Sequence, residues 1–493
     1  METFFIRALQ LILSLSILVV LHEFGHFTFA RIFKVRVEKF YMFFNPKISL
    51  VRAKKINGKW NFKFLASNVQ PNERMKLDSK GEPVMYGKNT VMEPVPLSEL
   101  PAGDWRLYPE STEWGIGWLP LGGYCKISGM IDETTDKTQM AQPIKPWEYR
   151  SRSVWQRLPI IIGGVLVNFI LALVIYSAVL FTWGKEYIPL QNAKYGLSFS
   201  KTMTDIGFRN GDKVLKVDNE VLETHQEVAK KIIYDNAKTV TVNRNGQVLD
   251  IAIPSDIEKK ILKSEATPID ICYPFVISQI ANNSPAQQAN MQEGDSIIAV
   301  NGKPMTLFQD ISPELSASIN KKIQLTYVRK GVIQNAEIQL GDNGKLGVGL
   351  RSPMDYLQTK KEKYGFFQSI PAGISMGVQT LKEYIKGFKL VFTKEGAKSL
   401  GGFGTIGKLF PPIWDWQTFW LMTAFLSVIL AFMNLLPIPG LDGGYVLFLL
   451  YEMITGKKPS DKFLENAQTA GMFLLLALLI YANGNDIFRA FFK

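Results

Sequence analysis

Long runs of apolar residues divide this 493-residue chain into alternating apolar and polar stretches. Four runs reach the length at which a helix crosses the hydrocarbon core of a bilayer, which takes about 20 residues. They lie at about 4–33, 157–183, 417–436 and 467–482. The pattern therefore predicts a polytopic α-helical membrane protein with about four transmembrane helices, whose polar stretches form domains outside the bilayer.

Basic residues gather beside these runs and predict their orientation. The clusters are Arg31, Lys34, Arg36, Lys39 and Lys47 after the first run, Arg150, Arg152 and Arg157 at the second, and Lys457, Lys458 and Lys462 between the third and fourth. Loops rich in Lys and Arg stay in the cytoplasm. We therefore expect both termini and the long 184–415 segment on the opposite side of the membrane.

The polar stretch after the first run has the pattern of β-strands. Residues 35–66 alternate between apolar and polar positions, and Asn57-Gly58 is a typical two-residue hairpin turn. Residues 67–113 are polar and rich in proline, which predicts a loop or insertion. The apolar, glycine-punctuated segment 115–124 then follows.

Residues 188–352 contain a weak internal repeat. Gly211-Asp212 and Gly294-Asp295 each precede a strand pattern that ends at a second turn. This arrangement resembles PDZ domains, which bind extended peptides by adding a strand to a sheet edge. Passive packing or a steric cover is an equally weighted role. Residues 364–392 predict an amphipathic helix on the membrane surface, with packing on the repeat as the alternative.

The most informative motif, His22-Glu23-Phe24-Gly25-His26, lies inside the first apolar run and holds two of the three histidines in the chain. Positions i and i+4 share one face of a helix, so the two imidazoles can bind one Zn²⁺ while Glu23 acts as general base on a water molecule. The motif also arises by chance. In an apolar run, however, an unliganded His and Glu would face hydrocarbon, which is costly.

A catalytic zinc site needs a third protein ligand and an open position. The best candidate is Asp442, at the end of the third apolar run. Pro437 and Pro439 would break a helix just before it, and broken backbone at membrane depth is tolerated where it lines a cavity. Both motifs lie on the predicted cytoplasmic side, so the topology allows them to meet. By itself, Leu-Asp-Gly-Gly could equally be a turn that ends a helix.

Composition excludes some classes of protein. The chain is 47% hydrophobic and 20% charged, as expected of a membrane protein with sizeable polar domains. Its net charge of +12 is not concentrated in a basic tract with interleaved aromatic residues, so we expect no nucleic-acid partner. Cys125 and Cys272 are too few for a disulfide framework or a Cys-rich zinc site.

Taken together, the HExxH motif, Pro120–Tyr124, the tandem repeat and Asn434–Gly444 resemble the site-2 protease family of intramembrane zinc metalloproteases, in its bacterial regulator-of-sigma-E protease branch. The resemblance covers nearly the whole chain. It implies a division into 1–34 (first helix with HExxH), 35–66 (membrane-associated β-hairpin), 67–150 (insertion and substrate-holding β segment), 157–184 (second helix), 188–256 and 268–352 (two periplasmic PDZ domains), 364–392 (surface helix), 416–445 (third helix with the Asp442 motif) and 466–489 (fourth helix).

The resemblance also implies roles for single residues. His22, His26 and Asp442 would hold one Zn²⁺ and Glu23 would be the catalytic base. Asn168 would lie near the scissile bond and Asn434 would assist with the substrate. The segment that contains Gly117, Leu119, Gly122 and Gly123 would hold the substrate as an added strand. In this chain Val165 stands after Gly164, where the family usually has proline.

The implied protein is a multi-pass enzyme of the bacterial inner membrane, with its active site towards the cytoplasm. It would cleave transmembrane segments of single-span proteins, such as anti-sigma factors or signal-peptide remnants, after an upstream site-1-type protease. The PDZ pair would limit the access of substrates. Two alternatives remain, a membrane zinc transporter or sensor and an inactive PDZ scaffold.

Overall fold

The computed structural model describes residues 2–67, 73–75, 82, 85–86, 89–90, 92–95, 97–100, 103–120, 122–130, 143–264, 267–355 and 357–492. Leu121 and parts of the predicted 67–113 insertion lie outside these residues. The chain forms two compact units. Unit 1 comprises Met1–Trp183, Tyr364–Tyr384 and Leu400–Lys493, and unit 2 comprises Gly184–Lys363 and Ile385–Ser399.

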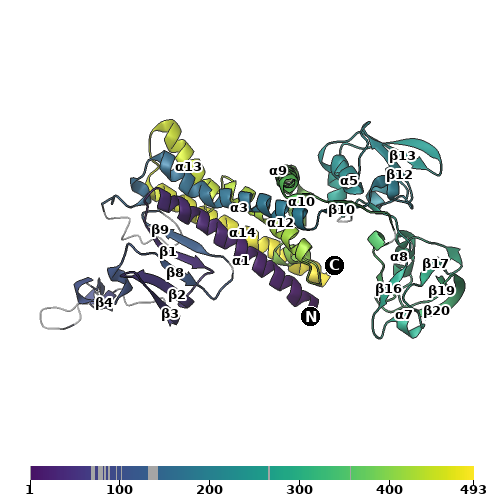
Figure 1. The fold of residues 1–493 in the computed structure, drawn as a ribbon, viewed down its shortest axis with the longest axis horizontal. Helices are drawn as coiled ribbons and strands as arrows, with labels where there is room; N and C mark the ends of the chain where they lie inside the picture. The colour runs from purple at the N-terminus through teal and green to yellow at the C-terminus, as the bar shows by residue number, and fades with distance from the viewer. Residues whose placement is uncertain are drawn as a thin grey trace. The chain divides into compact units, whose positions relative to one another are not determined.

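Within the described part of unit 1, four helices are long and apolar enough to cross a membrane, which agrees with the number predicted. They are α1 (Glu2–Ile32), α3 (Val154–Thr182), α12 (Trp416–Leu435) and α14 (Asp461–Phe492). Helix α3 packs against both α1 and α12 (Figure 1). Only 6% of the apolar window of α14 is buried within the protein, so lipid must cover most of this helix.

The predicted segment 416–445 is not one helix. Helix α12 ends at Leu435, and α13 (Asp442–Thr455) begins after a short irregular stretch. Pro437 and Pro439 lie in this stretch and lack the backbone N–H that a continuing helix requires. Gly440 adopts φ +94°, a left-handed conformation that favours glycine. The break therefore follows from the local sequence, and it places Asp442 at the start of a new helix.

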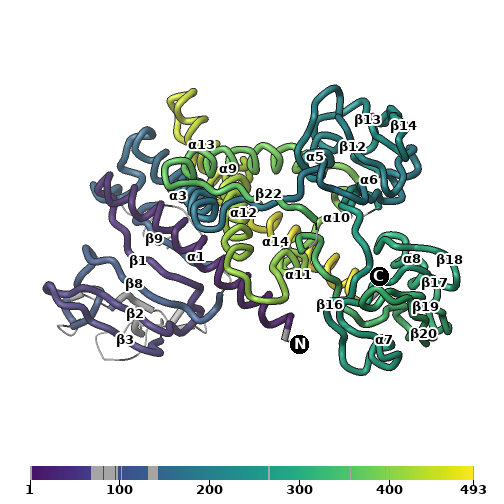
Figure 2. Tube along the Cα trace, turned by 45° about the vertical axis from the view of Figure 1, so that its right-hand side comes forward, coloured from purple at the N-terminus to yellow at the C-terminus, as the bar shows by residue number. Residues whose placement is uncertain are grey.

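A five-stranded sheet follows α1 and has the strand order β3-β2-β8-β1-β9 (Figures 1 and 2). Its strands are β1 (Val37–Met42), β2 (Ile48–Ile56), β3 (Lys59–Ser67), β8 (Glu113–Ile116) and β9 (Tyr124–Ile127). Strands β1 and β8 are parallel, and the other pairs are antiparallel. The sheet thus extends the predicted 35–66 hairpin with two later strands and leaves β9 at one edge.

The turn between β2 and β3 has the conformation that its sequence favours. Asn57 and Gly58 have φ values of 49° and 81°, and Ile56 pairs directly with Lys59. Positive φ at both central residues defines a type I′ turn, whose twist matches that of the flanking strands. This turn fixes the register of the β2–β3 hairpin.

A shared apolar core joins the sheet to the helices. Phe27 of α1 packs edge-on against Phe40 of β1 and Trp114 of β8, with ring centroids 5.8 and 5.0 Å away. The same core includes Ile160 of α3 and Leu449 of α13. Because four elements share one close-packed core, the sheet, α1, α3 and α13 hold one another in fixed positions.

Helix α9 (Phe366–Phe388) lies within the predicted amphipathic segment 364–392. Gly373 and Gly377 face α3 so closely that an added Cβ would overlap Ser177 and Leu173. The Tyr384 ring lies 5.5 Å from that of Phe432 in α12. Helix α9 therefore packs on two of the candidate membrane helices, a contact that neither of its predicted placements included.

Unit 2 has two lobes, each with its own core. The first contains β11 (Leu197–Phe199), β12 (Lys213–Val217), α5 (His225–Tyr234), β13 (Thr239–Arg244), β14 (Gln247–Ala252) and β15 (Ile269–Ile271). The second contains β16 (Ile277–Ile280), β17 (Ser296–Val300), α8 (Phe308–Ser316), β19 (Lys322–Arg329), β20 (Val332–Gln339) and β21 (Val348–Leu350). Strand β15 pairs with β11, so the first lobe extends past the predicted boundary at 256.

The sequence repeat corresponds to a repeated ion pair. Asp212 and Asp295, the acidic residues of the two Gly-Asp turns, are 1% and 0% exposed. Arg244 binds Asp212 through two nitrogens, each 2.7 Å from a carboxylate oxygen, and Arg329 binds Asp295 at 2.8 and 2.7 Å. Bidentate pairs of this kind fix geometry strongly. Each Gly-Asp turn is therefore tied to a strand of its own lobe.

The remaining elements are short. Those of unit 1 are β4 (Glu73–Met75), β5 (Met85–Tyr86), β6 (Asn89–Thr90), β7 (Met92–Pro94), η1 (Leu97–Glu99), η2 (Trp105–Leu107), η3 (Tyr149–Ser151) and α11 (Phe403–Lys408). Those of unit 2 are β10 (Lys185–Tyr187), η4 (Leu190–Asn192), α4 (Lys201–Thr204), α6 (Ile257–Ser264), α7 (Pro285–Gln288), β18 (Lys303–Pro304), η5 (Pro353–Asp355), β22 (Lys360–Glu362), η6 (Lys389–Phe392) and α10 (Lys394–Ser399).

Candidate metal centre

The two histidines of the HExxH motif lie one turn apart on α1. Their ring centroids are 4.7 Å apart and their Nε2 atoms are 3.1 Å apart. The Nδ1 atom of His26 lies 2.8 Å from the Ile160 carbonyl of α3. Because a carbonyl only accepts, Nδ1 of His26 carries the proton and Nε2 keeps its lone pair for a metal.

Asp442, the first residue of α13, completes a cluster of three possible ligands. Its Oδ2 atom lies 3.3 Å from Nε2 of His22 and 3.5 Å from Nε2 of His26. The carboxylate is in the first turn of its helix, where the helix dipole favours a negative charge. The structure thus brings Asp442 to two histidines that lie more than 400 positions before it in the sequence.

The spacing of these atoms fits one metal ion. The three distances between the donor atoms are 3.1, 3.3 and 3.5 Å. A tetrahedral zinc ion with bonds of about 2.0–2.2 Å separates its ligands by about 3.3–3.6 Å. Oδ2 of Asp442 is also buried and has no hydrogen-bond partner among the described residues. A bound cation would satisfy this oxygen. Two imidazoles and one carboxylate form the donor set of an open, catalytic type of zinc site.

Glycines allow α3 to approach the histidines. A Cβ on Gly25 of α1 would overlap the Gly163 carbonyl of α3. A Cβ on Gly164 would lie 2.6 Å from both Cε1 of His22 and Nε2 of His26. No side chain fits at these positions, so the two helices meet backbone to backbone. The Gly163-Gly164 pair was visible in the sequence, but its contact with the histidines was not predicted.

A second set of close contacts supports the loop before Asp442. An added Cβ on Gly443 would overlap the Leu436 carbonyl, and one on Gly471 of α14 would overlap the Pro439 carbonyl. The backbone N–H of Gly440 donates to Oε1 of Gln468, 2.7 Å away in α14. Helix α14 therefore holds the loop that carries the carboxylate. Gln468 and Gly471 were not predicted, because only the folded chain places α14 beside this loop.

Glu23 lies beside the cluster and faces the sheet. Its carboxylate is near the side chains of His22, His26 and Asp442, and it interacts with the backbone amide of Cys125 in the edge strand β9. The structure therefore places the predicted base between the three possible ligands and the edge strand β9.

Asn168 and Asn434 both point an amide at His22. Nδ2 of Asn168 lies 3.4 Å from Nδ1 of His22, and Nδ2 of Asn434 lies 3.5 Å from Nε2 of the same ring. Oδ1 of Asn168 is buried and unpartnered among the described residues. Turning this amide over would let Oδ1 accept a hydrogen bond from Nδ1–H of His22 and would leave Nε2 of His22 for the metal.

The four residues predicted to hold substrate lie in the loop between β8 and β9. The N–H groups of Gly117 and Leu119 already donate to the carbonyls of Met42 and Phe44, at 2.8 and 3.1 Å. Gly122 adopts φ +151°, and Gly123 packs against the Tyr41 carbonyl. The N–H groups of Gly117 and Leu119 are therefore engaged within the protein, whereas β9 is the edge strand of the sheet.

Comparisons with known proteins agree with a zinc site. A family model described as Peptidase family M50 matches residues 10–80 and 105–478. A Rickettsia conorii protein named as a candidate zinc metalloprotease is 26% identical over 482 residues, which cover 97% of this chain and 98% of that protein. The Regulator of sigma E protease of Haemophilus influenzae is 25% identical over 411 residues, or 78% of this chain and 89% of that protein.

A solved PDZ domain of an SdrC-like protein from Listeria monocytogenes aligns with 16% of this chain and 92% of that structure, at 16% identity and a TM-score of 0.15. A likeness this weak does not decide the fold of either lobe.

Gly164→Ala tests the close approach of α3. The new methyl group would overlap both imidazoles, so we expect the purified protein to lose most of its bound zinc, as measured by elemental analysis after gel filtration. Gly484→Ala is the matched control, because a Cβ on Gly484 meets nothing within 4 Å. Full zinc content in the Gly164→Ala protein would show that the histidines do not depend on this contact.

Proposed function

The chain belongs to peptidase family M50, the site-2 protease family, and we propose that it cleaves the transmembrane segments of other membrane proteins. It is a zinc metalloprotease. The observation that carries the proposal is the convergence of His22, His26 and Asp442 within a group of apolar helices. Polar groups in such surroundings are costly and are kept for function.

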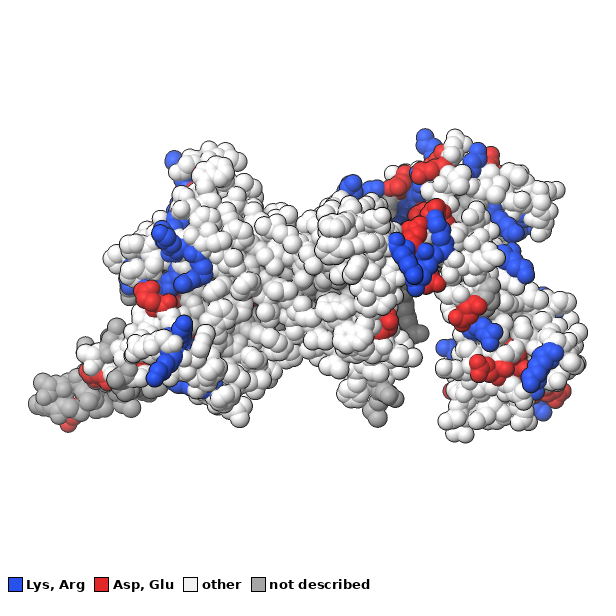
Figure 3. Space-filling view, viewed as in Figure 1, with Lys and Arg blue, Asp and Glu red and all other residues white. Residues whose placement is uncertain are grey.

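The proposed substrates are single-span membrane proteins, such as anti-sigma factors or signal-peptide remnants. Figure 3 supports a site within the bilayer, because the surface over the helices of unit 1 shows almost no Lys, Arg, Asp or Glu among the described residues on the face seen. Basic side chains gather at the end of unit 1 that carries the sheet. By the positive-inside rule this end faces the cytoplasm of a bacterial inner-membrane protein.

The residues around the centre can perform hydrolysis of a peptide bond. His22, His26 and Asp442 would hold a zinc ion, whose Lewis acidity would polarise the scissile carbonyl and make a water molecule more acidic. Glu23 takes the proton from the attacking water and returns it to the leaving amine. Asn168 orients His22 through Oδ1, and its Nδ2 and that of Asn434 can donate to the developing oxyanion or to the unwound substrate.

A transmembrane helix hides its peptide bonds in its own hydrogen bonds, so attack requires local unwinding. We propose that the unwound substrate pairs with β9, the edge strand of the sheet. Cys125 of β9 pairs with Phe40 of β1, and its backbone amide also interacts with Glu23. A strand added to this edge would therefore lie next to the base, and its backbone groups would find new partners.

The two lobes of unit 2 are proposed to be periplasmic PDZ-like domains that limit the access of substrates until an upstream protease has removed their external domains. The support is their predicted place between the second and third membrane helices, on the non-cytoplasmic side. Strands β10 and β22 pair antiparallel, with Tyr187 opposite Lys360, so the chain enters and leaves the segment Gly184–Lys363 at one place.

Glu23→Gln tests the proposed base. We expect cleavage of a model transmembrane peptide in detergent micelles to fall by about 10²–10⁴-fold, since the amide cannot accept a proton. Zinc content and thermal stability should stay at wild-type values. Asp461→Asn, an exposed carboxyl at the start of α14, serves as the control. If the protein were a zinc transporter or a scaffold, the Glu23→Gln and Asp461→Asn variants would cleave the peptide equally slowly. Unchanged cleavage by the Glu23→Gln variant would exclude Glu23 as the base.

Pairing with β9 predicts a period of two in the substrate. A series of model peptides, each N-methylated at one position near the scissile bond, should lose cleavage at alternate positions. Each lost bond to the strand should reduce kcat/KM by about 2–10-fold, since a hydrogen bond contributes about 0.5–1.5 kcal/mol. The unmethylated peptide is the reference. Equal losses of kcat/KM on N-methylation at neighbouring positions would contradict the proposal that the substrate pairs with β9 as a strand.

Deletion of residues 188–352 tests the access filter. Because β10 and β22 lie side by side, a short glycine linker can join the cut ends without stretching the chain. We expect the deleted protein to cleave a substrate that still carries its external domain, as measured by immunoblot in membranes. The shortened protein must also cleave a pretrimmed substrate at the wild-type rate. If the untrimmed substrate stays intact under that condition, the lobes are not a filter.

A further inference from the structure

The five-stranded sheet carries a polar pocket that has no part in the metal centre. Its volume is about 320 Å³, and it is lined by strands β1, β2, β8 and β9 together with the short helix at Trp105. Six basic side chains line it, namely Arg36, Lys39, Arg52, Lys54, Arg106 and Lys126. Only two carboxylates, Glu38 and Glu113, accompany them in the lining.

The register of the strands places three lysines in one row with a single glutamate, and two of the lysines lie directly opposite each other. Lys54 lies opposite Glu113, Glu113 lies opposite Lys39, and Lys39 lies opposite Lys126. Residues directly opposite in a sheet share one face, with Cβ atoms about 4.5–5.5 Å apart. Three lysines and one glutamate thus form a single row across four strands. Like charges directly opposite destabilise a sheet, so this row requires compensation.

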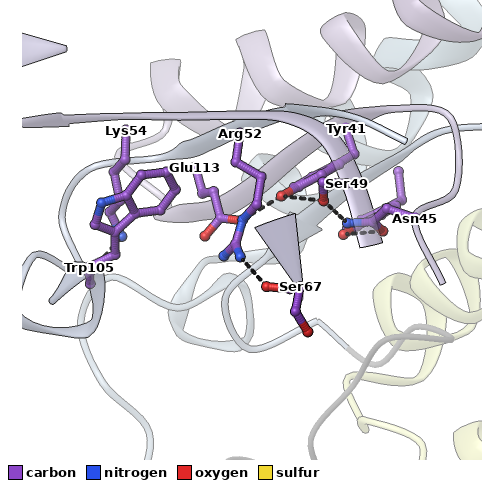
Figure 4. Close-up of polar contacts among 9 residues, drawn as sticks. Tyr41, Asn45, Ser49, Arg52, Lys54, Ser67, Trp105 and Glu113 are labelled. Atoms are coloured by element: carbon purple, nitrogen blue, oxygen red, sulfur yellow. Dashed lines mark hydrogen bonds and ion pairs between the residues drawn. The ribbon is translucent and has the colours of Figure 1, made fainter. Parts of the chain in front are cut away.

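The acidic groups nearby are already engaged. Glu113 accepts hydrogen bonds from Nε of Arg52 at 2.9 Å and from the Tyr41 hydroxyl at 2.5 Å (Figure 4). Glu38 pairs with Lys126 at 3.3 Å. Arg36 pairs with Glu110 and Arg106 with Asp104, outside the row.

Lys39 and Lys54 remain without an ion pair. Among the described residues, no carboxylate oxygen lies within 4.0 Å of either ammonium group. Nζ of Lys54 donates to the Trp105 carbonyl at 3.0 Å, which satisfies one of its three hydrogens, and the residue is only 7% exposed. Burial lowers the pKa of Lys39 and of Lys54, although Glu113 acts in the opposite direction on both.

We propose that this pocket binds a phosphate group, which places its negative charge between Lys39 and Lys54. A phosphate dianion would neutralise the buried ammonium group of Lys54 and the half-buried one of Lys39 at once and accept N–H bonds from both. The pocket has room for the group and several waters, given about 30 Å³ for each water. The ring of Trp105 is only 3% exposed and packs under Arg52, so the pocket offers no free aromatic face for a nucleotide base.

The phosphate could come from a soluble compound or from a lipid headgroup, and both share the recognised chemistry. The first test adds inorganic phosphate to the full-length protein in neutral detergent and measures the melting temperature. At ten times the dissociation constant we expect a rise of about 2–4 °C over sodium chloride of the same ionic strength. No rise beyond the chloride control, together with no effect of the lipid below, would overturn the proposal.

The second arm reconstitutes the protein in nanodiscs of phosphatidylcholine, with or without one fifth phosphatidic acid. A rise in melting temperature with phosphatidic acid alone assigns the site to a lipid headgroup, and a rise with inorganic phosphate in both discs assigns it to a soluble phosphate. The double variant Lys39→Met/Lys54→Met should lose the response in either case.

Lys55→Met is the matched control, because Lys55 is exposed and follows Lys54 on the opposite face of β2. It should keep the response. The single variants Lys39→Gln and Lys54→Gln guard against a double variant that fails to fold, and each should weaken phosphate binding by about tenfold or more. An undiminished response in both single variants, or an equal loss in Lys55→Met, would show that phosphate acts elsewhere.

Discussion

The backbone contact between α1 and α3 is the constraint on which the metal centre depends. Gly25, Gly163 and Gly164 leave no space for a side chain, so the two helices approach until the Ile160 carbonyl reaches His26. That bond fixes the tautomer of one imidazole, and Asn168 on the same helix reaches the other. In an apolar medium no water can take over these hydrogen bonds, so the geometry of the ligands rests on the closeness of the helices.

The position of Asp442, the third candidate ligand, depends on a different feature, the break between helices α12 and α13. Two prolines and a left-handed glycine separate α12 from α13 and turn the first residue of α13 towards α1. Irregular backbone is tolerated at this depth because other protein groups satisfy it, as Gln468 does for the N–H of Gly440. Helix α14 thus contributes to the centre without supplying a ligand, through Gln468 and the close approach at Gly471.

The sheet lies beside the candidate metal centre. The apolar core around Phe27, Phe40 and Trp114 fixes its strands on α1, and the edge strand β9 then lies beside Glu23. The charged row on the same sheet is a separate feature, because its residues face the polar pocket and take no part in binding the metal. One part of the sheet, at Cys125 of β9, therefore lies beside Glu23, and another part carries the charged row.

The sequence by itself determined what is local. Apolar runs gave the four spans, Asn57-Gly58 gave the hairpin turn, and the spacing of His22 and His26 placed two imidazoles on one helical face, because each depends on residues a few positions apart. The proline-flanked break after the third apolar run and the expected topology indicated Asp442, and the resemblance to a family implied the same residue. Only the tertiary structure decided the distances between Asp442 and the histidines and the glycine contact of α1 with α3. It also decided where the third span divides into two helices. The lysine row likewise depends on the pairing of strands that lie between residues 39 and 126. Such contacts arise when distant segments pack together, and no local pattern records which carbonyl or strand will become the neighbour.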